Sequence, residues 1–167
     1  MLLTLTEANI SLSKGALDII RSKAIPYEPH LPSLSYGYND EIMVKFYKKG
    51  SMLFIEAEKS DIHFKLDIDS LQYTNIKVNI GSIEASALAT VDDNLSMNIG
   101  AIQVTVKKEE VGDLHMQVNA GIIITTPSLI KVAPFGGHGC EAYYKGGLKG
   151  QKTELFVNVG AILCTIL

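Results

Sequence analysis

The chain has 167 residues, enough for one domain that buries roughly 70% of the surface its unfolded form exposes. Hydrophobic residues make up 47% of it and charged residues 20%, which excludes intrinsic disorder. With 15 basic and 18 acidic residues the formal net charge is −3, so no cationic face is expected that could neutralise a row of phosphates. We therefore predict that nucleic acid is not a partner.

The cysteines and the apolar segments indicate in which cellular compartment the protein is expected. Cys140 and Cys164 can form at most one disulfide, and Cys164 lies in an apolar run that predicts a buried thiol. The first residues lack the basic and apolar regions of a signal peptide, and no stretch approaches the ~20 apolar residues of a membrane span. The sequence alone therefore predicts a cytoplasmic chain without a membrane span.

In chain order, residues 11–40 are predicted to form an irregular wrap. Residues 15–21 could form a helical turn, and three prolines then fix an extended path over the surface: Pro26, Pro29 and Pro32. Strands are expected near 41–47 and 51–57, as the two partners of a hairpin.

A six-residue phrase then recurs, reading apolar, Asn, small apolar, Gly, any residue, Ile. It occupies 78–83, 97–102, 118–123 and 157–162. The glycines are separated by 19, 21 and 39 residues, and because 39 is close to two periods, a further coil, degraded or displaced by an insertion, should lie within 133–150. Fainter copies are expected at 57–62, with Ser60 in place of glycine, and at 5–10, with Ala8 in that place.

The repeat predicts stacked β-coils of roughly twenty residues. Apolar and polar residues alternate on both sides of each glycine, which indicates strands with one face in a core. Glycine permits a tight bend, so the four bends should stack in a row: Gly81, Gly100, Gly121 and Gly160. The asparagines could hydrogen-bond along the stack, or each could cap its local turn: Asn79, Asn98, Asn119 and Asn158.

Residues 133–152 interrupt the pattern and are predicted to be a protruding, glycine-rich loop. Such loops on a rigid scaffold commonly carry function. We expect an interaction site there, formed by Phe135, His138, Tyr143 and Tyr144.

Catalytic and metal chemistry are poorly supported. His138 and Cys140 lack the second ligand pair that a structural zinc needs, so no metal and no cofactor is predicted. The alternative to a binding module is a carbohydrate-active β-helix enzyme with acidic residues on a solenoid face: Asp92, Asp93, Glu109 and Glu110. Such an enzyme requires these carboxylates to meet in a groove, whereas turn residues would be dispersed.

Four features of the sequence together resemble those of a known family. They are the repeated phrase Asn-x-Gly-x-Ile, the opening segment 5–13, the proline-bearing segment 27–38, and the glycine and tyrosine insertion before 155–166. The sequence is similar to the bacterial toast-rack domain and the related putative-adhesin β-solenoids, including the soluble domain of Lia-type cell-envelope stress proteins. This resemblance implies a non-catalytic stacked-strand module, often tethered to a bacterial membrane, and thus an extracytoplasmic or membrane-associated placement.

We therefore predict an all-β fold, with residues 1–167 forming a single β-solenoid domain. The expected role is a structural or adhesin-like interaction module, possible partners being a protein or a cell-surface ligand. The apolar strand at 161–167 should be an uncapped edge, so self-association through the solenoid ends is also expected.

Overall fold

The computed structural model describes residues 6–21, 35–36, 43–49, 52–68, 71–89, 91–126 and 130–167, and only the backbone of β2, β3 and most of β4. Its elements are β1 (Glu7–Ile20), β2 (Ser35–Tyr36), β3 (Met43–Lys49), β4 (Met52–Asp67), β5 (Tyr73–Ala85), β6 (Asp92–Val106), the 3₁₀ turn η1 (Lys108–Glu110), β7 (Asp113–Thr126), β8 (Val132–Phe135), β9 (Gly139–Tyr144) and β10 (Lys152–Ile166). The predicted all-β, single-domain fold is confirmed.

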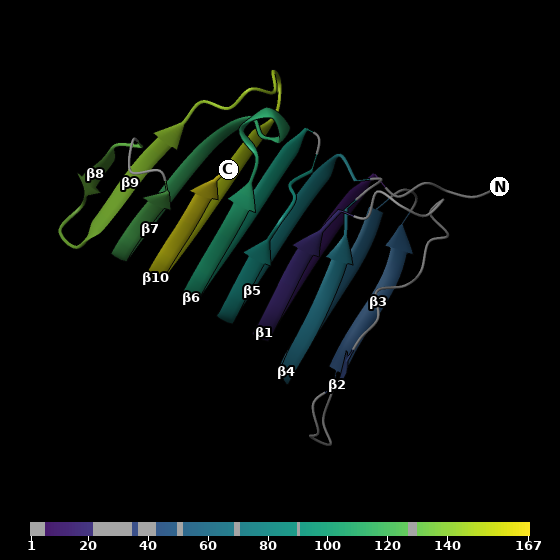
Figure 1. Cartoon of the computed structure of the whole chain (residues 1–167). Coiled ribbons are helices and arrows are strands. Elements are labelled where there is room, and N and C mark those ends of the chain that lie inside the picture. The colour runs from purple at the N-terminus through teal and green to yellow at the C-terminus, as the bar shows by residue number, and fades with distance from the viewer. Residues whose placement is uncertain are drawn as a thin grey trace.

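The ten strands form one sheet, in the order β2-β4-β1-β5-β6-β10-β7-β9-β8, with β3 also paired to β4 (Figure 1). The six central strands, from β4 to β7, are parallel. The strands at both ends are antiparallel: β2 and β3 against β4, and β8 and β9 beyond β7. The expected hairpin before residue 57 is present as β3 and β4.

The last strand does not follow the chain order of the stack. In Figure 1 the yellow β10 lies between β6 and β7, and Gly160 is in register with both Gly100 and Gly121. The expectation of another coil within 133–150 is therefore wrong, because the chain makes the antiparallel β8–β9 pair outside β7 and then returns. The expected C-terminal edge strand is also wrong, because β10 has a partner on each side.

Five of the long strands, β1, β5, β6, β7 and β10, are bent at a glycine, and both halves of each contribute alternate side chains to the core. Ile76, Leu95, Leu155 and Met116 occupy neighbouring positions before the bend and are at most 1% exposed. Ile83, Ile102 and Ile162 form a corresponding row after it. Register thus stacks like residues into continuous apolar rows, which is how the repeat generates its interior.

The bend requires glycine because successive corners touch. Gly100 has φ +144°, and a Cβ built there would lie 1.9 Å from the carbonyl oxygen of Gly81. Gly81 in turn is in register with Gly15, which has φ +150°. The predicted row of stacked glycines is present, and Gly15 is a fifth member that the sequence pattern did not identify.

The prediction that residues 11–40 are irregular is wrong for 11–20, which belong to β1. Leu12 and Leu17 are buried on either side of Gly15, and β1 pairs with β4 and β5 along its length. Two ladders of backbone hydrogen bonds outweigh the weak local tendency of 15–21 to form a helical turn. Residues 22–34 and 37–40, with the three prolines, lie outside the described residues.

The two faint repeat copies are also in the wrong register. Ala8 is inward-facing and pairs with Thr74, so it does not stand at the corner. In β4, Ala57 pairs with Leu12, but an irregularity follows, and Ile62 rather than Ser60 lies opposite Gly15.

A buried polar network closes the coils where the connections meet the strands. Asp93 is 2% exposed and accepts hydrogen bonds from the Thr74 hydroxyl at 2.5 Å, the Ala89 amide at 3.0 Å and the Thr153 hydroxyl at 3.2 Å. The buried Gln151 side chain donates to the Ala89 carbonyl and accepts from the Gly112 amide. This network joins β5, β6 and β10 to three connections, which contain Ala89, Gly112 and Gln151, and so fixes the register of the stack.

Candidate binding surface

The predicted interaction loop is largely an extension of the sheet. Within 133–152 lie most of β8 and all of β9, and β9 pairs with β7 from Leu114–Tyr144 to Val118–Cys140. The protruding-loop prediction is therefore wrong for this part. The alternation in β9 explains why, because Ala142 is buried while Tyr143 beside it is exposed.

The four loop residues lie on or beside this pair of strands. Tyr143 is 67% exposed on β9, and Phe135 is 37% exposed at the end of β8. His138 is exposed between the two strands, and Tyr144 packs against the core. Tyr143 and Phe135 are therefore exposed on strands that are hydrogen-bonded into the sheet.

A cluster that the sequence did not predict lies behind Tyr143. The His115 ring on β7 is within 2.7 Å of Glu141 on β9 through Nε2, and within 2.6 Å of Glu154 on β10 through Nδ1. The Tyr143 hydroxyl donates to Glu141 at 2.8 Å, and its ring stacks on that of His115 with centroids 4.4 Å apart. Three strands are therefore tied together at one imidazole.

The carboxylates determine the charge of this cluster. Burial of the His115 ring opposes protonation, but the hydrogen bonds that the ring donates to Glu141 and Glu154, with the charges of these carboxylates, outweigh it and raise the pKa of His115 above 6.5. The pKa of Glu141 is lowered below 4.5, first by the Tyr143 hydroxyl and then by His115. With both nitrogens directed at carboxylates, the protonated imidazole is a cationic link between the strands.

The sequence gives little sign of this cluster because its members are far apart along the chain. His115, Glu141 and Glu154 are each outward-facing positions of an alternating strand, but only the strand order brings them together. The insertion of β10 beside β7 places Glu154 opposite His115. Strand order was the part of the fold that the repeat could not provide.

The acidic residues of the enzyme alternative are divided. Asp93 is buried with both carboxylate oxygens hydrogen-bonded, whereas Glu109 and Glu110 are exposed in η1. These two glutamates line a cavity with Arg21, and neither Asp92 nor Asp93 lines it. Among the described residues, no group of three or more His, Cys, Asp or Glu side chains is arranged to hold a metal ion.

The repeat asparagines form a ladder on the outer surface. The Asn98 amide donates to Asn79 at 2.9 Å, Asn158 to Asn98 at 2.9 Å, and Asn119 to Asn158 at 3.1 Å. Of the two arrangements expected from sequence, hydrogen bonding along the stack is the one observed. The ladder follows the spatial order of the coils.

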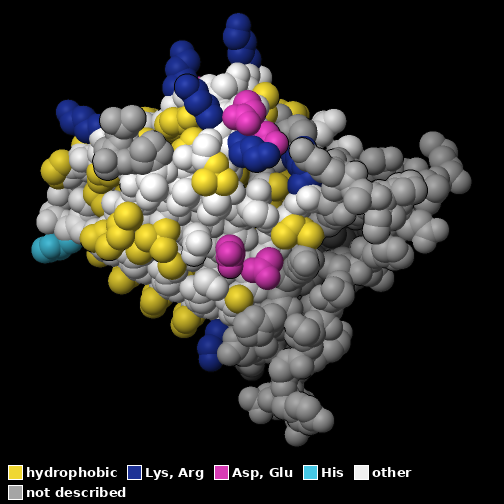
Figure 2. Space-filling model, in the orientation of Figure 1, with side chains coloured by type: hydrophobic (Ala, Val, Ile, Leu, Met, Phe, Trp, Pro, Cys, Tyr) yellow, Lys and Arg dark blue, Asp and Glu magenta, His cyan; other side chains and the backbone are white. Residues whose placement is uncertain are grey.

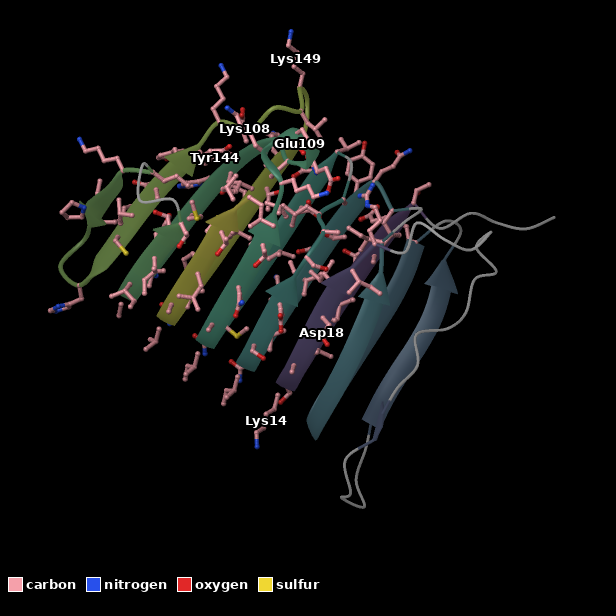
Figure 3. All side chains as sticks on the ribbon, in the orientation of Figure 1. Lys14, Asp18, Lys108, Glu109, Tyr144 and Lys149 are labelled. Carbon is pink, nitrogen blue, oxygen red and sulfur yellow. The ribbon has the colours of Figure 1, made fainter. Side chains whose placement is uncertain are left out.

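An exposed aliphatic ridge runs beside this ladder. Ile80, Ile99 and Val159 immediately precede the corner glycines, share one register, and are 42%, 46% and 45% exposed. Figure 2 shows a line of hydrophobic side chains along the lower left margin. In Figure 3 Lys14, which is in register with Ile80, projects at the end of this line.

These features define an all-β, single-domain protein of bent and stacked parallel strands. No family model matches the sequence, and no curated protein matches it either. The fold is similar to the crystal structure of a putative cell adhesion protein from Clostridium sporogenes, with a TM-score of 0.57 and 14% identity over 98% of this chain and 93% of that one. At this identity the likeness shows the fold alone. Within the described residues, no helix is long and apolar enough to cross a membrane.

Proposed function

We propose that this protein is a non-catalytic, adhesin-like interaction module whose contact surface is the β8–β9 pair. The observation that carries the proposal is the placement of Tyr143 and Phe135, two exposed aromatic side chains on strands that are hydrogen-bonded into the sheet. Rigid aromatic groups lose little conformational entropy on binding, and they dominate contact energies at protein surfaces.

The partner class in this proposal is a protein or surface ligand of the bacterial envelope. Support comes from the toast-rack and putative-adhesin resemblance, including Lia-type envelope stress proteins, and from the fold shared with a protein described as a putative cell adhesion protein. On this proposal the chain is placed at or outside the membrane.

The test compares two variants in a pelleting assay with purified bacterial cell walls and with vesicles of envelope lipid. A Phe135→Ser and Tyr143→Ser double variant should reduce binding by about thirtyfold or more, because the loss of even one contact residue that contributes about 2 kcal/mol has an effect of this size. Ile99→Ser, which removes from the ridge an apolar side chain that is 46% exposed, between the values for Phe135 and Tyr143, is the matched control and should bind as the native protein does. Equal binding by the native protein and the double variant contradicts the proposal.

We also propose self-association through the β7 edge instead of through the C-terminal strand. β7 pairs with β10 as far as Thr126, but its described pairing with β9 ends at Val118. Ala120 and Gly121 still pair with His138 beyond it. Past these two residues, Ile122 and Ile124 are 54% and 50% exposed, and the described edge from Ile122 to Thr126 carries no charge. An uncharged apolar edge favours pairing with another strand.

Ile124→Lys places a charge on this edge and should shift the sedimentation profile towards monomer. Ile80→Lys, on the ridge, is the control for charge alone. A native protein that is monomeric at all concentrations rules out this part of the proposal.

A further inference from the structure

A cavity of about 440 Å³ lies at one end of the sheet, among the start of η1, the residues before β8 and the ends of β9 and β10. Its volume falls within the ~300–1,000 Å³ typical of small-ligand sites. Figure 3 shows Lys108 and Tyr144 together at this end of the molecule. The strands that form the wall are fixed by the pairing of β7 with both β9 and β10.

The charged side chains at this cavity are all cationic. Lys108, Lys131 and Lys145 line it from three separate segments, and no aspartate or glutamate does. Within the described residues none of the three forms a salt bridge, whereas the neighbouring Lys107 pairs with Glu110. Glu109 and Glu110 line a different cavity, with Arg21. The side chains that line this cavity therefore carry a net positive charge, in a chain of net charge −3.

The remaining wall is mainly apolar. Ile130, Ile166 and Leu167 line the cavity together with Tyr143 and Tyr144. Ile130 is buried and Ile166 half-buried, while Leu167 is 69% exposed. Lysines can extend their charged ends to an anion while their methylene stems cover an apolar ligand.

We propose that this cavity binds a single-chain anionic amphiphile, such as a long-chain carboxylate, with its head among the three lysines and its tail along the aliphatic wall. A metal cation is disfavoured by the same lysines, and a bare anion would leave the apolar wall unused. The inference goes beyond the proposed function, because it concerns a small ligand in a cavity that Phe135 does not line.

The experiment measures binding of dodecanoate to the full chain by calorimetry, below the concentration at which the ligand forms micelles. Acetate supplies the head without the tail, dodecyl maltoside the tail without charge, and dodecyltrimethylammonium the tail with opposite charge. Saturable 1:1 binding of dodecanoate, with none of acetate or dodecyltrimethylammonium, is expected. Binding should weaken as salt rises, because salt screens the lysines.

Lys131→Gln and Lys145→Gln should each weaken dodecanoate binding about two- to fivefold, the range for partly exposed charge pairs. The matched control, Lys149→Gln, removes an exposed lysine that does not line the cavity and should leave binding unchanged. Leu167→Ser should weaken dodecanoate binding with little risk to folding. The inference is overturned if dodecyltrimethylammonium binds as tightly as dodecanoate, if Lys149→Gln matches the cavity variants, or if dodecanoate does not bind. Phe135→Ser should leave this binding intact, so failure of the proposed function is separately visible.

Discussion

The buried carboxyl of Asp93 helps to fix the register of the strands, but its burial lowers the stability of the fold. Burial raises its pKa above 3.8, because loss of hydration outweighs the hydrogen bonds from Thr74, Ala89 and Thr153. A raised carboxyl pKa means that the folded state binds the proton more tightly. Ionisation of Asp93 therefore lowers stability as pH rises from 3.8 through the folded-state pKa.

Asp93→Asn removes this charge and keeps the geometry. The Asn oxygen can accept from Thr74 and Ala89, and its amide can donate to the Thr153 oxygen. We expect a higher urea midpoint than the native protein at pH 7, and a difference that closes as pH falls below 3.8. Asp93→Ala, by contrast, should cost about 1–3 kcal/mol for each buried donor left unpaired. A neutral-pH midpoint for Asp93→Asn as low as that of Asp93→Ala would contradict this account.

His115 should make stability depend on pH in the opposite sense. Its folded-state pKa is raised, so its contribution is complete below about 6.5 and is lost as pH rises through the folded-state value. The folded-state pKa of Glu141 is lowered, so the contribution of Glu141 to stability is complete above pH 4.5 and is lost as pH falls through that folded-state pKa. The cluster of His115, Glu141, Tyr143 and Glu154 therefore stabilises most between pH 4.5 and 6.5.

His115→Gln should lower the unfolding midpoint most within this window and least at high pH, where the native imidazole is neutral. Urea titrations at pH 5.5 and pH 9 measure the difference. A His138→Gln variant, which changes an exposed histidine outside the cluster, should show no such trend. If His115→Gln lowers both midpoints equally, the imidazole acts by packing and not by charge.

At the scale of the strand, the corner glycine is the feature that sequence predicted best. Four phrases place Gly81, Gly100, Gly121 and Gly160 in register because a Cβ is excluded at each corner. Gly15 was missed because its phrase lacks both the Asn and the Ile. Alternation of apolar residues is therefore the more general signal, and the Asn-x-Gly phrase identifies only the coils that also share the ladder.

Gly100→Ala should destabilise the protein by on the order of 3–5 kcal/mol, since the backbone is strained for alanine and the Cβ meets a carbonyl that cannot move freely. Gly137→Ala is the control, because nothing lies within 4 Å of a Cβ at that position, and it should change stability by less than about 0.5 kcal/mol. Thermal unfolding followed by circular dichroism compares the two. Similar melting temperatures would show that the corners are more adaptable than their spacing implies.

The asparagine ladder should contribute measurably less than the glycine row, because its hydrogen bonds are exposed. Asn98 is bonded to both Asn79 and Asn158, so Asn98→Ala should cost about 1 kcal/mol. Asn94 is an exposed residue of the same strand outside the ladder, and Asn94→Ala should cost less than about 0.5 kcal/mol. Chemical denaturation of the two variants resolves this difference. If the ladder does not contribute to stability, the two variants will have equal free energies of unfolding.

At the scale of the molecule, the repeat predicted coils but could not predict their order. An interval of 39 residues between Gly121 and Gly160 is equally compatible with a degraded coil and with a strand that returns to the stack. The period of the repeat gives the length of each coil, but it does not indicate which other coils that coil pairs with. Both the candidate contact surface and the His115 cluster depend on the strand order. The aromatic residues of the surface could therefore be named from the sequence, but the strands and side chains that surround them could not.

The return of β10 also makes the fold indivisible. β6 and β7 follow each other in the chain, yet both pair with β10 and are joined through it. In a stack built in chain order, the last coil could be removed with the loss of one interface. Here, removal of residues 152–167 separates β6 from β7 and takes away Thr153, Glu154 and the buried Val157 and Ile162.

We therefore expect a chain ending at residue 151 to lose cooperative unfolding altogether, because each half is left with an open apolar edge. Far-ultraviolet circular dichroism and urea titration test this directly. A synthetic peptide of residues 152–167, added to the shortened chain, should restore the strand signal in a saturable way, whereas the same peptide with Gly160→Val should not, since the corner excludes a side chain. If the shortened chain keeps a single sharp transition, the part before β7 folds by itself. The stack would then be additive, as in other repeat proteins, despite the central position of its last strand.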